Sequence, residues 1–302
     1  MTSSFSSKVF RFAPSPNGYL HVGHAFSALL NDAMARREHG RLLLRLEDID
    51  AERCRPQYDA AIIEDLRWLG VGFEEPVRRQ SQHFDKYSAA LDQLVARGLL
   101  YPCFCSRGDV LHTVAKLGAN WPRDPDGAHH YPGLCRCRST HEAAQFRALG
   151  RPAAHRLDMA RARATLGDPL QWRELGLDGV ERMIAAAPQD WGDPILSRKD
   201  IPASYHIAVV VDDALQGVTD VVRGADLLQA TSLHRLLQAL LDLPEPRYRH
   251  HALLRDAAGY KLSKSLRAKS LRSMRAEGAS PADVRRVLAS ELDAAYAELL
   301  TA

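Results

Sequence analysis

The chain has 302 residues, of which 46% are hydrophobic and 25% are charged, and its formal net charge at pH 7 is +3. This is an ordinary composition for a soluble protein with room for two compact units. No run of about 18 apolar residues is present, so no membrane-spanning helix is expected. The Ser-rich start has neither the apolar core nor the cleavage pattern of a signal peptide.

The net charge is too small to indicate a nucleic-acid partner, but the charge is unevenly distributed. Residues 247–286 contain 11 Lys and Arg against 3 Asp and Glu, a local charge of +8 that leaves −5 for the rest of the chain. A basic segment on an acidic body favours a polyanionic ligand held on one face. A solvated helix face is the alternative.

The first predicted elements form a strand, a tight loop and a helix. Val9–Phe12 is predicted to be a buried strand, and the Pro- and Gly-containing loop 13–20 must end it. Helical apolar spacing then begins close to His24. His21 and His24, separated by Gly23, would lie at a helix start, where backbone N–H groups and the helix dipole favour a phosphate. A turn that holds two histidines by chance is the alternative.

The next segments continue a strand and helix alternation. Arg41–Leu46 is predicted to be a second buried strand, and helices are predicted over 56–69 and 84–97. This alternation favours a parallel α/β sheet. Ligands of such sheets bind at the carboxyl ends of the strands, which is where Ser15 and Glu47 fall.

The pattern changes at about residue 101. The stretch 101–202 holds the cysteine pairs and has weak periodicity, so it is predicted to be an insertion. Beyond it, 206–211 and 218–223 are predicted to be strands and 227–241 an amphipathic helix. One α/β domain is therefore expected to be split around a smaller one. The expected divisions are 1–100, 101–202, 203–265 and a short helical C-terminal region, 266–302.

A second candidate phosphate motif lies in the basic segment. Residues 259–265 read Gly-Tyr-Lys-Leu-Ser-Lys-Ser, in which Lys261 and Lys264 could close on a polyphosphate. Lys264 would then neutralise the charge of departing pyrophosphate. Taken alone, this is a common surface loop. Its pairing with the His-x-Gly-His motif in one sheet domain favours a nucleotide site.

These two motifs resemble the HIGH and KMSKS signatures of class I aminoacyl-tRNA synthetases, with Val22 and Leu262 as conservative departures. Residues 12–18, 44–50 and 218–226 are similar to the glutamyl subgroup. The similarity spans roughly residues 8 to 270. It implies a Rossmann-like parallel sheet split by a zinc-bearing insertion.

Only 37 residues follow Ser265, whereas a full glutamyl-tRNA synthetase carries a large anticodon-binding region there. A short chain of this type with a Cys-x-Cys insertion resembles the glutamyl-queuosine tRNA(Asp) synthetases. The resemblance implies an enzyme whose partners are ATP, L-glutamate and queuosine-bearing tRNA(Asp). A minimal glutamyl-tRNA synthetase, a nucleotidylyltransferase and a non-catalytic RNA-binding paralogue are the alternatives. A cytoplasmic monomer is expected.

Glutamate carries two carboxylates and one ammonium, so its pocket needs cations and an anion. Arg11 and Arg223 could bind carboxylates, Glu47 the ammonium, and Tyr205 could donate a hydrogen bond. The resemblance assigns glutamate binding to Arg11, Ala13, Ser15, Glu47, Tyr205 and Arg223. It assigns ATP binding to His21, Gly23, His24, Lys261 and Lys264. It implies catalysis by His21, His24 and Lys264, with Mg2+ accompanying ATP.

The two Cys-x-Cys pairs, four of the five cysteines, predict a structural zinc site in a reducing compartment. Four thiolates, from Cys103, Cys105, Cys135 and Cys137, are the direct interpretation. The resemblance instead implies Cys103, Cys105, Tyr131 and Cys135, with Tyr131 bound as a phenolate. Buried cysteines without a metal are a further alternative, and Cys54 has no partner nearby.

Basic residues near the end of the chain are candidate RNA phosphate contacts. They are Arg267, Lys269, Arg272 and Arg275.

Overall fold

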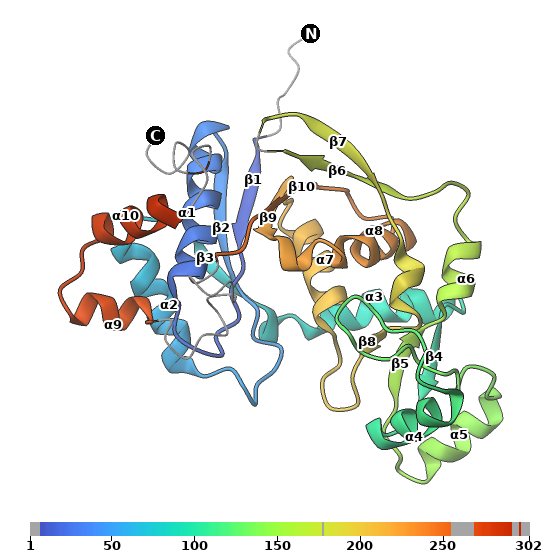
Figure 1. The fold of residues 1–302 in the computed structure, drawn as a ribbon. Helices are drawn as coiled ribbons and strands as arrows, with labels where there is room; N and C mark the ends of the chain where they lie inside the picture. Colours follow the sequence, from blue (N-terminus) through green and yellow to red (C-terminus); the bar gives the residue numbers. More distant parts are fainter. Residues whose placement is uncertain (1–6, 177, 255–268, 292–295, 297–302) are drawn as a thin grey trace.

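The structure of the protein is a computed structural model that describes residues 7–176, 178–254, 269–291 and 296 (Figure 1). The predicted phosphate loop lies outside the described residues, and with it Lys261, Lys264 and Arg267.

A seven-stranded sheet forms the centre of the molecule, in the order β3-β2-β1-β9-β10-β6-β7. Every neighbouring pair is parallel except β6 and β7, which form an antiparallel hairpin. The predicted α/β fold with a parallel sheet is therefore confirmed. The strands are β1 (Val9–Phe12), β2 (Arg41–Leu46), β3 (Glu74–Arg79), β6 (Gln171–Leu175), β7 (Glu181–Ala185), β9 (Asp220–Gly224) and β10 (Arg247–His251).

Helices cover both faces of this sheet (Figure 1). On one side α1 contacts α10 and α2 contacts α9, and on the other α7 contacts both α3 and α8. The helices predicted over 56–69, 84–97 and 227–241 are confirmed as α2, α3 and α8. The bounds are α1 (Val22–Arg37), α2 (Pro56–Trp68), α3 (Phe84–Ala96), α7 (Tyr205–Leu215), α8 (Ala230–Leu240), α9 (Leu271–Ala276) and α10 (Pro281–Glu291).

The prediction of a strand at 206–211 is wrong, because these residues belong to helix α7. Seven consecutive residues of this helix, Ile207–Asp213, are buried. A short apolar run that is buried on all sides shows no helical period, so the sequence alone does not separate it from a buried strand. The next strand, β9, and helix α8 were predicted correctly.

A smaller unit follows α3 in the chain. It contains the antiparallel sheet β4-β5-β8, and its helices flank the cysteines. The hairpin β6–β7 falls inside 101–202 yet extends the central sheet, which the sequence pattern did not predict. The remaining bounds are β4 (Leu100–Cys103), β5 (Ala154–Leu157), β8 (Ile195–Ser197), α4 (Arg107–Leu117), α5 (Thr140–Ala148), α6 (Met159–Ala164) and the short 3-10 turns Gln80–Gln82, Pro188–Trp191 and Ala225–Leu227.

Candidate active site

A cavity of about 480 Å³ lies at the carboxyl ends of β1, β2, β9 and β10. Parallel strands end at the same edge of a sheet, and the crossover connections leave an open crevice there. All the predicted site residues of the central sheet that the structure describes line this cavity. They are Arg11, Ala13, Ser15, His21, Gly23, His24, Glu47, Tyr205 and Arg223.

Two histidines cap the start of α1. His21 is the N-cap residue, and its Nδ1 accepts a hydrogen bond from the Gly23 N–H at 3.1 Å. Nδ1 of His24 accepts from the His21 N–H at 3.2 Å, and the two ring centroids are 3.9 Å apart. Because both Nδ1 atoms accept, each neutral ring carries its proton on Nε2. The local fold therefore fixes both the position and the tautomer of these side chains.

Gly23 is required by the same cap. A Cβ atom there would lie 2.9 Å from Cε1 of His21. Any larger residue would displace the ring from its capping position. The glycine also keeps the cavity wall flat at the helix start, which suits the approach of a planar base.

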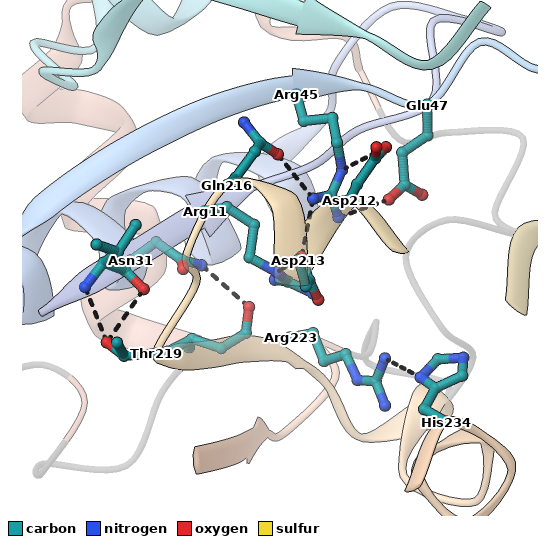
Figure 2. A network of polar contacts seen from close by, with 12 residues as sticks. Arg11, Asn31, Arg45, Glu47, Asp212, Asp213, Gln216, Thr219, Arg223 and His234 are labelled. Carbon is teal, nitrogen blue, oxygen red and sulfur yellow. Dashed lines mark hydrogen bonds and ion pairs between the residues drawn. The ribbon is translucent and has the colours of Figure 1, made fainter. Parts of the chain in front are cut away.

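A buried charge network lies beneath the cavity (Figure 2). Arg45, with 0% of its side chain exposed, donates to Asp213 at 2.8 Å and to Glu47 at 3.3 Å. Nε of Arg11 donates to the same oxygen of Asp213 at 3.2 Å. Within the described part of the chain, the terminal nitrogens of Arg11 have no hydrogen-bond partner. Arg11 therefore lines the cavity with a forked donor pair that fits a carboxylate.

The carboxyl of Glu47 lies in the cavity wall, and its pKa is above the ordinary value for a glutamate. Burial raises the pKa of Glu47, and the opposing effects of Arg45 and Arg11 do not cancel it. Asp213 shows the reverse balance, because Arg11 and Arg45 outweigh burial and lower its pKa. Asp213 therefore serves as the permanent counter-charge of Arg11 and Arg45, whereas Glu47, which also contacts Arg45, presents its carboxyl to the cavity.

Arg223, on β9, is held entirely by neutral acceptors. Its Nε donates to Nε2 of His250 at 3.1 Å, and Nη1 donates to Nδ1 of His234 at 3.2 Å. Nη2 donates to Thr231 at 2.8 Å and to the carbonyl oxygen of Leu227 at 3.2 Å. With the described residues Arg223 forms no ion pair, so its positive charge stays available to an anion in the cavity.

The tautomers of these two histidines follow from Arg223, which only donates. His250 must carry its proton on Nδ1, which contacts Glu174 at 2.9 Å. His234 must carry its proton on Nε2, which contacts His206 at 3.2 Å. Burial lowers the pKa of both His250 and His234, so both stay neutral at pH 7.

Tyr205, the first residue of α7, contributes a neutral donor. Burial raises the pKa of Tyr205 to about 12, so its hydroxyl keeps its proton. The cavity thus combines two arginines, the carboxylates of Glu47 and Asp226, one phenol and a helix start. Such a set can bind a doubly anionic amino acid next to a phosphate.

Sequence reasoning missed the residues that hold the site in place, namely Arg45, Glu174, Asp212, Asp213, His234 and His250. Arg45 could have been found, because a charged residue inside the apolar run Arg41–Leu46 requires a buried partner. The histidines carry no such signal, since each lies in an ordinary helix or strand pattern.

The cysteine cluster lies in the smaller unit, at the end of β4. The sulfur atoms of Cys103, Cys105 and Cys135 lie within 4.8 Å of one another. The hydroxyl of Tyr131 lies 3.3 Å from Sγ of Cys105 and accepts from the backbone N–H of Cys135 at 2.8 Å. Tetrahedral zinc with thiolate ligands brings sulfurs to about 3.8 Å from one another, so this cluster fits the ion. Cys137 is exposed and lies outside the three-thiol group.

The described candidate RNA contacts are partly engaged within the protein. Lys269 pairs with Glu277 at 2.6 Å, and Arg275 pairs with Glu64 at 2.9 Å. Arg272 lies over the ring of Tyr19, 5.2 Å from its centroid. Within the described ranges, every helix is too short or too polar to cross a lipid bilayer.

Comparison with known proteins agrees with the fold and the cavity. Residues 8–290 match the family described as tRNA synthetases class I (E and Q), catalytic domain. A glutamate tRNA ligase structure from Elizabethkingia meningosepticum is similar, with a TM-score of 0.69 and 23% identity, over 91% of this chain and 54% of that chain. At that identity the likeness shows the fold alone, and this chain spans about half the length of that one. The chain is therefore a class I tRNA synthetase, a ligase.

More similar relatives narrow the family. A glutamyl-Q tRNA(Asp) synthetase of Rhodobacter capsulatus is 46% identical over 93% of this chain and 99% of its own length. A glutamyl-Q tRNA(Asp) synthetase of Nocardia farcinica is 40% identical over 93% of this chain and 84% of its own length. A glutamate–tRNA ligase of Aquifex aeolicus is 35% identical over 90% of this chain but only 54% of its own length. This chain belongs to the glutamyl-Q tRNA(Asp) synthetase family, which confirms the sequence resemblance.

Proposed function

We propose that the enzyme activates L-glutamate with ATP and transfers the glutamyl group to the queuosine base in the anticodon of tRNA(Asp). The observation that carries the activation step is the single cavity that combines Arg11, Arg223 and Glu47 with the histidine-capped start of α1. The acceptor is inferred from the names of the relatives at 46% and 40% identity.

Glutamate binds with its side-chain carboxylate on Arg11 and Arg223. The α-carboxylate is the nucleophile, so it must stay clear of a strong forked ion pair and face the phosphate. The free donor pair of Arg11 and the uncompensated charge of Arg223 then select an amino acid with a second carboxylate. Glu47 receives the ammonium, and Tyr205 donates to the bound anion.

ATP binds at the start of α1. Its phosphates interact with the positive end of the helix dipole and accept hydrogen bonds from the histidine N–H groups. Gly23 leaves room for the base. Lys261 and Lys264 of the loop outside the described residues add positive charge to the phosphates. Mg2+ bound with ATP supplies further charge neutralisation.

The reaction then proceeds by in-line displacement. An oxygen of the glutamate α-carboxylate forms a bond to the α-phosphorus of ATP, and the bond to the bridging oxygen breaks, which releases pyrophosphate. A hydroxyl of the RNA attacks the carbonyl carbon of the resulting glutamyl-adenylate, so an ester forms and AMP leaves. The protein positions the reactants and stabilises the developing charge.

Cys103, Cys105, Tyr131 and Cys135 are the proposed ligands of one structural zinc ion. The backbone N–H of Cys135 donates to the Tyr131 oxygen, and the guanidinium of Arg156 lies 4.0 Å from the centroid of its ring. Both contacts favour a phenolate, but burial and the neighbouring thiols raise the pKa of Tyr131, so the bound ion would have to displace the proton. When bound, the ion would cross-link the loop that follows β4 to the loop that carries Tyr131 and Cys135.

Glutamate-dependent exchange of pyrophosphate into ATP tests the activation step. His24→Ala should lower the exchange rate by about 100-fold or more, because a donor to the reacting phosphates is lost. His112→Ala is the matched control, since this exposed histidine of α4 is remote from the cavity. Equal exchange rates in the two variants would show that His24 has no role in the activation step. No exchange in the wild type would refute the proposed activation of glutamate.

A second candidate is a minimal glutamyl-tRNA synthetase that charges a tRNA 3′ end. The similarity to the ligase of Aquifex aeolicus favours it. Both candidates need the same amino-acid pocket, so the RNA acceptor alone separates them.

A further inference from the structure

A second cavity, of about 260 Å³, is lined by residues from the end of α1, from the start of β10, and by Leu175, Asp178 and Gly179. It shares no lining residue with the active-site cavity. Three arginines line it, Arg37, Arg247 and Arg249, together with the carboxylates Glu38 and Asp178. None of these residues takes part in the proposed reaction.

Arg249 is a buried cation that forms no ion pair with the described residues. It is 7% exposed, and its Nε is buried without a hydrogen-bond partner. It lies on the same face of β10 as His251, whose ring packs 4.7 Å from that of Phe26 on α1. Across the described ranges, Arg249 forms neither an ion pair nor a side-chain hydrogen bond. Burial lowers the pKa of Arg249, and Arg37 and Arg247 act in the same direction, against the smaller opposing effects of Tyr296 and Glu174.

The two carboxylates that line the cavity pair with other arginines. Arg247 pairs with Asp220 at 2.7 Å and faces Glu38 and Glu181, each at 3.9 Å, and Asp178 pairs with Arg182. Arg37, which is exposed at the mouth of the cavity, forms no ion pair with the residues that the structure describes. Two guanidinium groups, one buried and one at the mouth, therefore lack an ion-pair partner among the described residues.

We propose that this cavity binds a phosphate group, with Arg249 at its base and Arg37 at its mouth. A buried charge without a partner is costly, so an anion that fills the cavity would relieve the cost. The planar fork of arginine matches phosphate oxygens, and two arginines without an ion-pair partner can bind several oxygens of one phosphate. Free phosphate and a phosphodiester of bound RNA offer the same chemistry.

Inorganic phosphate is the first probe, added to the full chain while its melting temperature is followed. Phosphate should raise the melting temperature of the wild type, and Arg249→Met should lose most of that rise. Arg67→Met, which removes an exposed arginine of α2 outside both cavities, should keep it. Without phosphate, the Arg249→Met variant should melt no lower than the wild type, because it removes an uncompensated buried charge.

Arg37→Met is the second variant, and it should lose part of the phosphate-dependent rise without any risk to the core. A rise that is equal in the wild type, Arg249→Met and Arg37→Met would overturn the proposal, because any phosphate would then be binding elsewhere.

Affinity for tRNA distinguishes the source of the phosphate, and this arm alone rests on the proposed function. If RNA supplies the group, Arg249→Met should weaken tRNA binding. It should also reduce the slope of the logarithm of the binding constant against the logarithm of the salt concentration by about the value for one phosphate contact, while Arg67→Met leaves both unchanged. If tRNA binding is unchanged while the phosphate effect is lost, the ligand is free phosphate. The melting experiment stands whatever the RNA acceptor proves to be.

Discussion

Glu47 is a carboxylate kept in the wall of the active-site cavity by burial and by Arg45, and its proposed partner is the substrate ammonium. Glu47→Gln removes that charge and keeps the shape of the side chain. We expect kcat/KM for glutamate to fall by about 10- to 100-fold at neutral pH, the value of a charge-assisted hydrogen bond. Glu74→Gln, on a half-exposed carboxylate of β3, should change it little.

The pH dependence of KM follows from the same residue. Because burial raises the pKa of Glu47, the wild-type carboxylate becomes neutral before an ordinary glutamate as the pH falls. The KM for glutamate should therefore rise on the acid side, and Glu47→Gln should lack this acid limb. A parallel acid limb in the variant would show that another group titrates.

Glu174 acts through Arg223, as a positioning residue. It holds the proton of His250 on Nδ1, so that Nε2 accepts from Arg223. Glu174→Gln should raise KM for glutamate by about 3- to 10-fold and leave kcat within a factor of about two, because Arg223 is misplaced and no reacting group is lost. Glu181→Gln, on a 42%-exposed carboxylate of the neighbouring strand, is the control. A fall in kcat alone would contradict the positioning role.

Among the helices and strands, the sequence predicted the ones whose apolar residues recur with a clear period. It missed the ones that are defined by tertiary contacts. The strand β1 and helices α1, α2 and α3 have strong apolar patterns and turn signals, and all were predicted. Helix α7 was mistaken for a strand because burial on every side erases its period. The pairing of β6 with β10 depends on a contact across more than 70 residues, which no local pattern reports.

The proposed zinc site leads to a testable prediction about its fourth ligand. Cys137→Ser should retain about one zinc ion per chain, because Cys137 lies outside the cluster. Cys135→Ser should lose the ion, and Tyr131→Phe should bind it more weakly, since each removes a proposed ligand. Metal analysis of the purified variants measures this. Loss of zinc from Cys137→Ser would assign the fourth position to Cys137 instead.

The contact between α2 and α9 contains a buried carboxyl that opposes stability. Asp65 is 0% exposed, neither of its oxygens has a hydrogen-bond partner, and Arg275 is 3.7 Å away. Burial raises the pKa of Asp65 from 3.8 to about 6, so the folded state binds this proton more tightly than the unfolded state does. The contribution of this group to the free energy of unfolding therefore falls as the pH rises from 4 through 6.

Asp65→Asn should remove that dependence and raise the free energy of unfolding at pH 7.5 by about 1–3 kcal/mol. Arg275 keeps its ion pair with Glu64 in this variant. Asp59→Asn, in the first turn of the same helix, should give no such gain because Asp59 pairs with Arg79. Urea unfolding at pH 5 and pH 7.5 measures both variants, and an unchanged pH dependence in Asp65→Asn would refute this assignment.

At the scale of the whole molecule, the fold brings together residues from distant parts of the chain. Arg11 lies in β1 and Glu47 directly follows β2, and Tyr205 and Arg223 come from elements that follow the smaller unit. The sequence predicted this set through motifs shared with a family, and the structure places all four in one cavity. The network beneath them was not predicted, because its members pair across separations such as the 168 residues between Arg45 and Asp213.

Labelled glutamate, supplied with ATP and Mg2+, is the reagent that tests the proposed function most directly. The acceptors are tRNA(Asp) with queuosine, tRNA(Asp) without it, and tRNA(Glu). We predict that label appears only on queuosine-containing tRNA(Asp) and remains with the anticodon fragment after cleavage of the RNA. Label on tRNA(Glu), or on the 3′ end of any tRNA, would contradict the account and identify a compact glutamyl-tRNA synthetase.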